Sequence, residues 1–119
     1  MSSSTAEYQC QDFMTELPPL PEGEFSVFGI VFAHPEHADA LEAVYAETTR
    51  LSASEPGTIY YCLSRDPDDR TAFHFFERYT GRRAFEDHND QPIIRKLMAD
   101  QLIKGVKAKF VGAIKPATA

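Results

Sequence analysis

The sequence predicts a single domain of the α+β class, with elements in the order β-α-β-β-α-β. Three observations lead to this prediction. Residues 24–34 are a nearly continuous apolar run, residues 35–54 repeat apolar side chains at helical spacing, and residues 57–80 hold two aromatic-rich segments around an Asp-Pro turn. At 119 residues, the chain is long enough to bury a core of its own.

The first strand and the first helix are strongly marked. The segment "EFSVFGIVFAH" at residues 24–34 predicts a strand buried on both faces, because its apolar run shows no alternation. Pro35 suits the first turn of a helix, and Pro56-Gly57 ends that helix and turns the chain. The inward stripe of the helix is predicted to be Leu41, Val44, Tyr45, Thr48 and Leu51.

The second half of the domain starts with a hairpin. Two strands, at residues 57–65 and 71–80, are joined by the turn "DPDD". A short helix is predicted over residues 81–90, a second helix begins at Pro92, and a last strand covers residues 105–116 with one face toward water. This order is that of the ferredoxin-like class, in which helices cover one side of a four-stranded antiparallel sheet.

Charge and composition argue against several kinds of partner. The net charge of −6 leaves no basic surplus for nucleic acid. No stretch approaches the about 18–20 apolar residues of a membrane span, and the N-terminus has no signal-peptide pattern. Cys10 and Cys62 are expected to be reduced thiols, so we expect a cytoplasmic protein. Residues 1–23 are predicted to be a flexible N-terminal arm, and residues 24–116 the folded domain.

Both faces of the predicted hairpin carry aromatic side chains. Alternation along the first strand separates Ile59, Tyr61 and Leu63 from Tyr60, Cys62 and Ser64. Along the second strand it separates Phe73, Phe75, Glu77 and Tyr79 from His74, Phe76 and Arg78. Helices cover only one face, and an aromatic face left bare favours aggregation. We therefore expect a homodimer in which two sheets pack face to face.

The hairpin and the helix after it resemble the signature of the antibiotic biosynthesis monooxygenase (ABM) domain, of the dimeric α+β barrel superfamily. That signature has a Glu-Pro-Gly turn, an aromatic residue, an Asp-Pro hairpin, the pattern Phe-x-x-x-Glu-x-aromatic, and then a His. The matching residues are Glu55, Gly57, Tyr61, Asp66, Pro67, Phe73, Glu77, Tyr79 and His88. The resemblance covers roughly residues 24–115.

The resemblance implies a subunit that dimerises through its sheet, with a pocket between the sheet and its own helices. Members include cofactor-independent oxygenases of quinols and polyketide anthrones, haem-degrading oxygenases, and an isomerase of a phosphorylated sugar. The haem-degrading branch has an Asn in the first strand and a Trp where His88 stands; this chain has neither. No cofactor is therefore expected. Where anthrone oxygenases often carry Trp, this chain has Tyr79.

Oxygenation without a cofactor requires a base, hydrogen-bond donors for the substrate anion, and an apolar cavity. Histidine is the natural base near neutral pH. We predict His88, Tyr79 and Glu77 to be catalytic, and Tyr61, Phe75 and Phe85 to bind substrate. The alternatives are that His88 caps or packs at its helix end, that Tyr61 is a core tyrosine, and that Glu77 forms a structural ion pair with an arginine such as Arg82 or Arg95.

The remaining histidines indicate no metal site. His74 is expected to point into the dimer barrel as a structural residue, and His34 and His37 are expected to cap a helix start. The predicted function is a cofactor-independent monooxygenase that uses dioxygen on an aromatic, quinol-like or polyketide-type small molecule. A non-oxidative isomerase or cyclase, and a non-catalytic dimer that binds small molecules, remain open.

Overall fold

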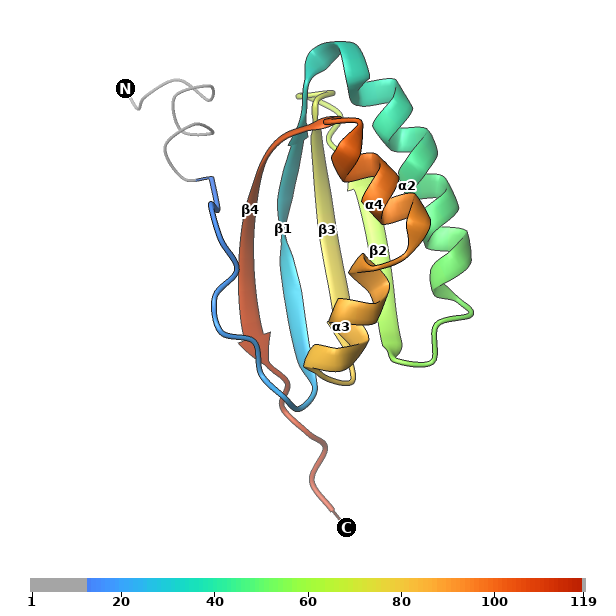
Figure 1. Ribbon diagram of the computed structural model, residues 1–119. Coiled ribbons are helices and arrows are strands. Elements are labelled where there is room, and N and C mark those ends of the chain that lie inside the picture. Colours follow the sequence, from blue (N-terminus) through green and yellow to red (C-terminus); the bar gives the residue numbers. More distant parts are fainter. Residues whose placement is uncertain (1–12, 119) are drawn as a thin grey trace, which may run out of the picture.

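The computed structural model describes residues 13–118, and Figure 1 shows its strands and helices. The predicted order of strands and helices is confirmed. The elements are β1 (Phe25–Ala33), the 3-10 turn η1 (Pro35–His37), α2 (Ala38–Ser52), β2 (Thr58–Arg65), β3 (Ala72–Tyr79), α3 (Arg82–Asn89), α4 (Pro92–Ala99) and β4 (Ile103–Gly112). None of the helices among residues 13–118 is long and apolar enough to cross a membrane.

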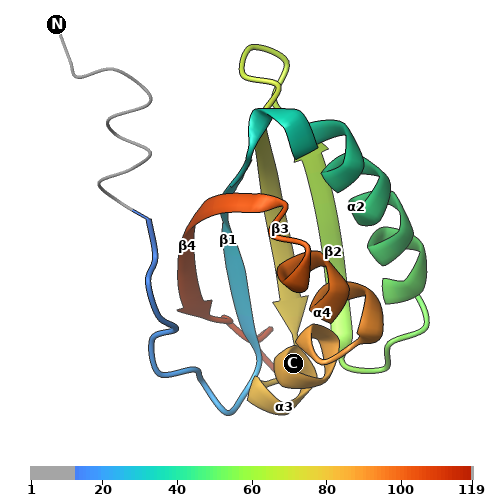
Figure 2. The same ribbon diagram turned by 45° about the horizontal axis from the view of Figure 1, so that its top comes forward.

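The four strands form one sheet in the order β2-β3-β1-β4, and all neighbouring strands are antiparallel. The central strands are β1 and β3, in which Phe25 lies opposite Tyr79 and Val27 lies opposite Glu77. Helices α2, α3 and α4 cover the same face of the sheet (Figures 1 and 2). The α+β, ferredoxin-like class is therefore confirmed, whereas the homodimer stays a prediction.

The buried face of α2 follows helical spacing, with one correction. Leu41, Tyr45 and Thr48 are buried, as predicted. In the last turn the buried residue is Ser52, and Leu51 is only partly buried. Position 52 continues the steps of three and four residues that keep side chains on one helical face. The Ser52 hydroxyl donates a hydrogen bond of 2.8 Å to the carbonyl oxygen of Thr49, so its burial leaves no unpaired hydroxyl.

A register shift at the start of β2 corrects the predicted position of Ile59. Thr58 pairs with Tyr79 and Tyr60 pairs with Arg78, so Ile59 has no partner opposite it in β3. An extra residue of this kind breaks the alternation of side chains. The Ile59 side chain is consequently exposed, and it does not share the covered face with Tyr61 as strict alternation predicted.

The face of the sheet away from the helices carries exposed aromatic side chains. Phe28 stacks on Phe76 with ring centroids 6.0 Å apart, and Tyr60 meets Phe76 edge-on at 5.8 Å. All three side chains are exposed in the single chain, and His74 lies on the same face. We call Phe28, Tyr60 and Phe76 the aromatic face. It is the surface that the sequence predicts to be covered by a second copy.

Residues 13–23 run along the β4 edge of the sheet (Figure 1). The backbone N–H of Met14 donates to the carbonyl oxygen of Val106 at 2.7 Å. The Phe13 ring lies against Gly105, where an added Cβ would come within 2.3 Å of that ring. Leu20 packs on the core beside α3. The part of the predicted arm before Phe13, with Cys10, lies outside the described residues.

Candidate functional site

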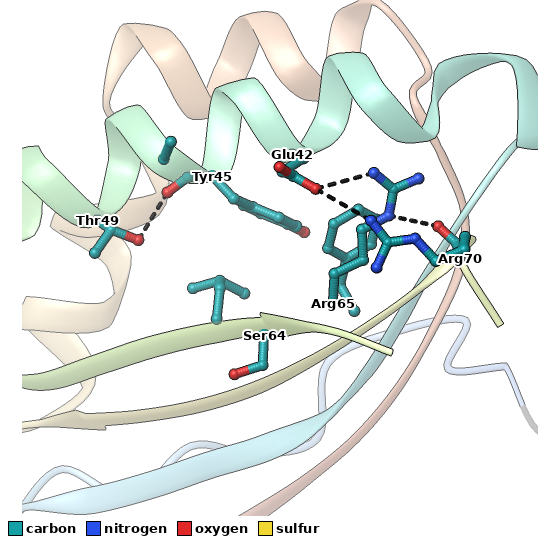
Figure 3. A pocket seen from close by; sticks show the side chains of 9 residues that line it. Glu42, Tyr45, Thr49, Ser64, Arg65 and Arg70 are labelled. Carbon is teal, nitrogen blue, oxygen red and sulfur yellow. Dashed lines mark hydrogen bonds and ion pairs between the residues drawn. The ribbon is translucent and has the colours of Figure 1, made fainter. Parts of the chain in front are cut away.

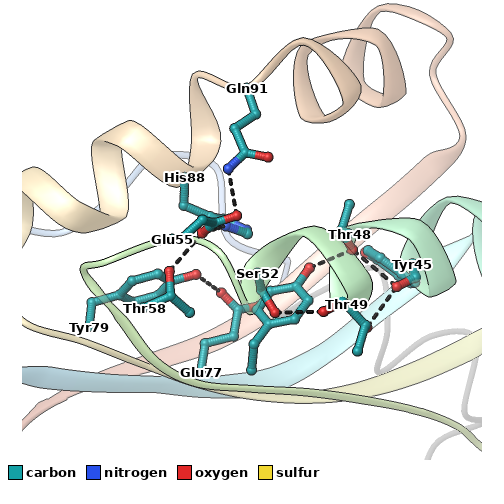
Figure 4. Close-up of polar contacts among 11 residues, drawn as sticks. Tyr45, Thr48, Thr49, Ser52, Glu55, Thr58, Glu77, Tyr79, His88 and Gln91 are labelled. Carbon is teal, nitrogen blue, oxygen red and sulfur yellow. Dashed lines mark hydrogen bonds and ion pairs between the residues drawn. The ribbon is translucent and has the colours of Figure 1, made fainter.

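A histidine–carboxylate pair lies where α3 meets the turn before β2 (Figure 4). The His88 side chain is 4% exposed, and its Nδ1 lies 2.8 Å from Oε1 of Glu55, whose side chain is 14% exposed. The Nε2 atom of His88 has no hydrogen-bond partner among residues 13–118. A ring whose Nδ1 is fixed by a carboxylate presents its other nitrogen in one orientation. We call Glu55 and His88 the dyad.

Three donors hold the carboxylate of Glu55. Besides His88, the Thr58 hydroxyl donates to Oε1 at 2.7 Å, and the Gln91 amide donates to Oε2 at 2.5 Å. Burial alone would raise the pKa of Glu55, but the hydrogen bonds from Thr58, His88 and Gln91 outweigh it and lower the pKa. Glu55 is thus an ionised acceptor in a fixed position, which suits a residue that orients an imidazole.

Glu77 and Tyr79 form a second polar pair on β3, beneath the helices. The Tyr79 hydroxyl donates to Oε1 of Glu77 at 2.5 Å. The pKa of Glu77 is raised overall. Desolvation raises it by more than the hydrogen bond from Tyr79 and the charge of His88 lower it. The predicted ion pair of Glu77 with Arg82 or Arg95 is wrong. Those arginines project to the surface, where they pair with Glu22 and Asp90.

Tyr61 brings β2 into the same cluster. Its hydroxyl shares a hydrogen bond of 2.9 Å with the Thr48 hydroxyl of α2, and its ring centroid lies 5.0 Å from that of His88. The Tyr79 ring lies 5.6 Å from His88. Burial raises the pKa of both tyrosines, so both phenols remain hydrogen-bond donors at neutral pH. The structure thus brings together Tyr61, Glu77, Tyr79 and His88, as predicted.

The two predicted apolar residues lie beside this cluster. Phe75 is partly buried in the middle of β3 and packs against both halves of the core. Phe85 is buried one turn before His88, with its ring edge-on to Tyr79 at 5.3 Å. Phe85 also lines a separate cavity of about 270 Å³, together with Leu17, Leu20, Glu86, Asn89 and Asp90. Whether Phe75 and Phe85 contact a substrate stays a prediction.

Solvent reaches the dyad through a cavity of about 240 Å³. The residues that line it are Ser54, Glu55, Pro56, Gly57, Thr58, Ala84, Asp87, His88 and Gln91. This cavity lies on the side of the Glu-Pro-Gly turn. A small molecule that entered it would therefore meet the carboxylate–imidazole pair directly.

The other histidines serve different purposes. His74 Nε2 lies 2.8 Å from Oδ2 of Asp66 at the hairpin turn. His34 and His37 occupy helix N-cap positions, but neither side chain makes a capping hydrogen bond, so the expected side-chain capping is wrong. Within residues 13–118, no group of three or more His, Cys, Asp or Glu side chains could hold a metal ion.

Sequence reasoning did not identify the partners of the predicted site residues. Glu55 was assigned only to a turn motif, Thr48 only to the inward stripe of its helix, and Thr58 and Gln91 were assigned no role. For Glu55, the clue in the sequence was that it belongs to the same family signature as His88. Thr48 and Gln91 carry no such signal, because their contacts join elements that are distant in sequence.

Comparison with known proteins places the fold and the family. The sequence model described as "Antibiotic biosynthesis monooxygenase" matches residues 25–100. The structure is similar to PA3566 from Pseudomonas aeruginosa, with a TM-score of 0.68, 23% identity, and coverage of 78% of this chain and 96% of that one. It is also similar to Rv0793 from Mycobacterium tuberculosis, with a TM-score of 0.66, 22% identity, and coverage of 80% and 99%.

A third similar structure is named only as an antibiotic biosynthesis monooxygenase. It has a TM-score of 0.66 and 22% identity, and the alignment covers 76% of this chain and 99% of that one. No curated protein matches the sequence. At these identities the solved structures support the fold alone, and the family rests on the match over residues 25–100. The chain belongs to the antibiotic biosynthesis monooxygenase family.

Proposed function

We propose that the protein is a cofactor-independent monooxygenase of an aromatic, quinol-like or polyketide-type small molecule. The observation that carries this proposal is the dyad, in which a partly buried carboxylate fixes one nitrogen of the buried His88 and leaves the other without a partner in the described chain. A base held in this way suits the removal of a proton from a phenolic or anthrone substrate.

The reaction needs no redox group of the protein. His88 takes the substrate proton, and the resulting anion is electron-rich enough to reduce dioxygen. For an anthrone, the oxidised CH₂ carbon gains one oxygen atom as a carbonyl, and the second oxygen atom leaves as water with the two hydrogens of that carbon. In this proposal Tyr61 and Tyr79 exchange their hydrogen bonds to Thr48 and Glu77 for hydrogen bonds to the anion, and Phe75 and Phe85 supply apolar surface.

Dissolved-oxygen consumption tests this function. Dialysed, metal-stripped protein is mixed with hydroquinones, naphthols and anthrones, and His88→Ala and His37→Ala are measured in parallel. Uptake is expected for the wild type and His37→Ala and is expected to be lost in His88→Ala. No uptake across the whole panel would count against the oxygenase.

A non-oxidative isomerase or cyclase is the second candidate, and Glu77 favours it. The raised pKa of Glu77 beside His88 provides a second group that can exchange protons within the cluster. An isomerase moves a proton and consumes no oxygen. Turnover that continues under nitrogen and depends on both His88 and Glu77 would support this candidate over the oxygenase.

We also propose that the protein is a homodimer whose interface is the aromatic face. Phe28, Tyr60 and Phe76 form a contiguous exposed cluster on the sheet. Phe76→Arg places a charge at its centre, so we expect this variant to elute as a monomer in size-exclusion chromatography with light scattering, where the wild type elutes as a dimer. Met98→Arg, which adds a charge at an exposed site on α4, is the matched control.

A further inference from the structure

A cavity of about 350 Å³ opens between α2 and the β2–β3 hairpin (Figure 3). Its volume falls within the range of small-molecule sites, about 300–1,000 Å³. The residues that line it are Glu42, Tyr45, Ala46, Thr49, Leu63, Ser64, Arg65, Arg70 and Phe73. It shares no lining residue with the cavity at the dyad. We call it the hairpin pocket.

The inner surface of the hairpin pocket is apolar and aromatic. The rings of Tyr45 and Phe73 meet edge-on with centroids 5.5 Å apart, and the Leu63 side chain lies beside them. The Ser64 side chain points away from the pocket, on the other side of its strand (Figure 3). Rings in this edge-to-face arrangement provide surface on which a further aromatic ring packs favourably.

Two arginines at the mouth of the pocket have different surroundings. Arg65 is held by protein groups, because its Nη1 lies 2.8 Å from Asp39 and 2.9 Å from Glu42, and its Nε donates to the carbonyl oxygen of Arg70. The Arg70 side chain is 60% exposed, and the nearest carboxylate oxygen, of Glu42, lies 3.9 Å from its Nη2. That separation is too long for a hydrogen bond. The guanidinium donors of Arg70 are thus available at the mouth.

The hairpin turn fixes the backbone between these arginines. Oδ1 of Asp66 accepts the backbone N–H groups of Asp68 at 2.8 Å and Asp69 at 3.0 Å. Oδ1 of Asp69 accepts the backbone N–H and the hydroxyl of Thr71, at 3.1 and 2.6 Å. A turn closed by side-chain hydrogen bonds of this kind positions its flanking residues before a ligand arrives.

We propose that the hairpin pocket binds an aromatic carboxylate. The aromatic ring of the ligand packs on Tyr45, Phe73 and Leu63, and its carboxylate pairs with the guanidinium of Arg70. Arginine suits this role, because its planar fork of donors matches the two oxygens of a carboxylate. The proposal concerns binding alone and does not depend on the reaction proposed at His88, since the two cavities are separate.

The test uses 2-naphthoate as the probe and its neutral analogue 2-naphthalenemethanol as the comparison, with binding followed by the fluorescence of the naphthalene ring. The wild type should bind the acid more tightly than the alcohol. Arg70→Gln should weaken acid binding roughly tenfold, the effect of one lost charge-assisted hydrogen bond. The same variant should leave binding of the alcohol unchanged. Ala46→Leu fills the cavity from a helix position and should weaken both ligands.

Two matched variants make the result specific. Arg50→Gln removes an exposed arginine of α2 that pairs with Glu47 and does not line the pocket, so it should bind 2-naphthoate as the wild type does. The naphthalene probes resemble the naphthols proposed as substrates at His88, so the ratio of acid to alcohol affinity is also measured in His88→Ala. An unchanged ratio separates this proposal from the proposed reaction. Equal losses in Arg70→Gln and Arg50→Gln, equal affinity for acid and alcohol, no saturable binding by the wild type, or binding that survives Ala46→Leu would each overturn the proposal.

Discussion

Two histidine–carboxylate pairs in this protein have the same nitrogen–oxygen distance and different surroundings. The His88–Glu55 and His74–Asp66 contacts both measure 2.8 Å. The side chains of the first pair are 4% and 14% exposed, whereas those of the second are 48% and 26% exposed. The first pair adjoins Tyr61 and Tyr79 beneath the helices, and the second stands at the hairpin turn on the aromatic face of the sheet.

The difference shows why distance alone does not identify a site. The pKa of Asp66 is lowered to about 2 by its hydrogen bonds to His74 and to the backbone N–H groups of Asp69 and Asp68, so that carboxylate organises its own turn. Glu55 is held by side chains of β2, of α3 and of the residue before α4, and its histidine partner is buried. A buried pair held by several helices and strands is typical of a reactive site, as at His88 and Glu55. A pair held by hydrogen bonds within one turn is typical of a structural role, as at His74 and Asp66.

The largest expected difference between the pairs is in catalysis. His88→Ala should reduce the rate of oxygen uptake by roughly 10²–10⁴-fold, the range for removal of a general base. His74→Ala should change the rate less than twofold, because His74 lies on the other face of the sheet. Steady-state oxygen consumption with the best substrate measures both. A similar loss of oxygen-uptake rate in His88→Ala and His74→Ala would contradict the difference assigned to the two pairs.

A smaller effect is expected from the carboxylate partners. Glu55→Gln should reduce kcat by roughly ten- to a hundredfold, since it removes one charge-assisted hydrogen bond to the base. Asp66→Asn is the matched control and should leave kcat near the wild-type value. KM should change little in either variant if Glu55 acts through His88. A large rise in KM with constant kcat for Glu55→Gln would assign Glu55 to substrate binding.

Thermal unfolding of Glu77→Gln tests the partly buried carboxylate beside the dyad. A folded-state pKa above the ordinary value means that ionised Glu77 destabilises the fold above that ordinary pKa, and that this cost disappears as pH falls and the group protonates. Glu77→Gln should therefore raise Tm at pH 8, by roughly 2–4 °C. The gain should shrink at pH 4. A gain that is independent of pH would exclude this electrostatic cause.

The smallest effect is expected from the exposed pair, with the opposite dependence on pH. A lowered folded-state pKa means that ionised Asp66 contributes stability above about pH 4, and that this contribution is lost as pH falls toward 2. Asp66→Asn should lower Tm slightly at pH 7, and the difference from the wild type should vanish near pH 2. Differential scanning calorimetry at both pH values measures it. A larger difference at pH 2 than at pH 7 would reverse the assigned sign.

Two features were predictable from the local sequence pattern: the central strands, and the side chains of the site that lie on one face. Apolar and aromatic runs marked β1 and β3, and alternation along β3 placed Glu77 and Tyr79 on one face. Helical spacing placed His88 one turn after Phe85 on the inward face of α3. These predictions succeeded because period and parity depend only on neighbours along the chain.

The parts that were missed depend on contacts between distant residues. Glu55 and His88 are 33 positions apart, and their hydrogen bond requires the turn before β2 to meet α3. Ile59 was misplaced because one extra residue shifts the register, and nothing in the local alternation marks that residue. The hairpin pocket was not foreseen, because its mouth joins Glu42 of α2 to Arg65 and Arg70 at the two ends of a turn.

The central claim is that His88 is the base, and anaerobic mixing of the protein with its substrate tests it most directly. A naphthol or anthrone whose anion absorbs at longer wavelength than the neutral form reports proton removal before oxygen takes part. We expect the anion band to appear with the wild type and with His74→Ala and to be absent with His88→Ala. A band of equal size with His88→Ala, in protein whose fold is intact, would contradict the account.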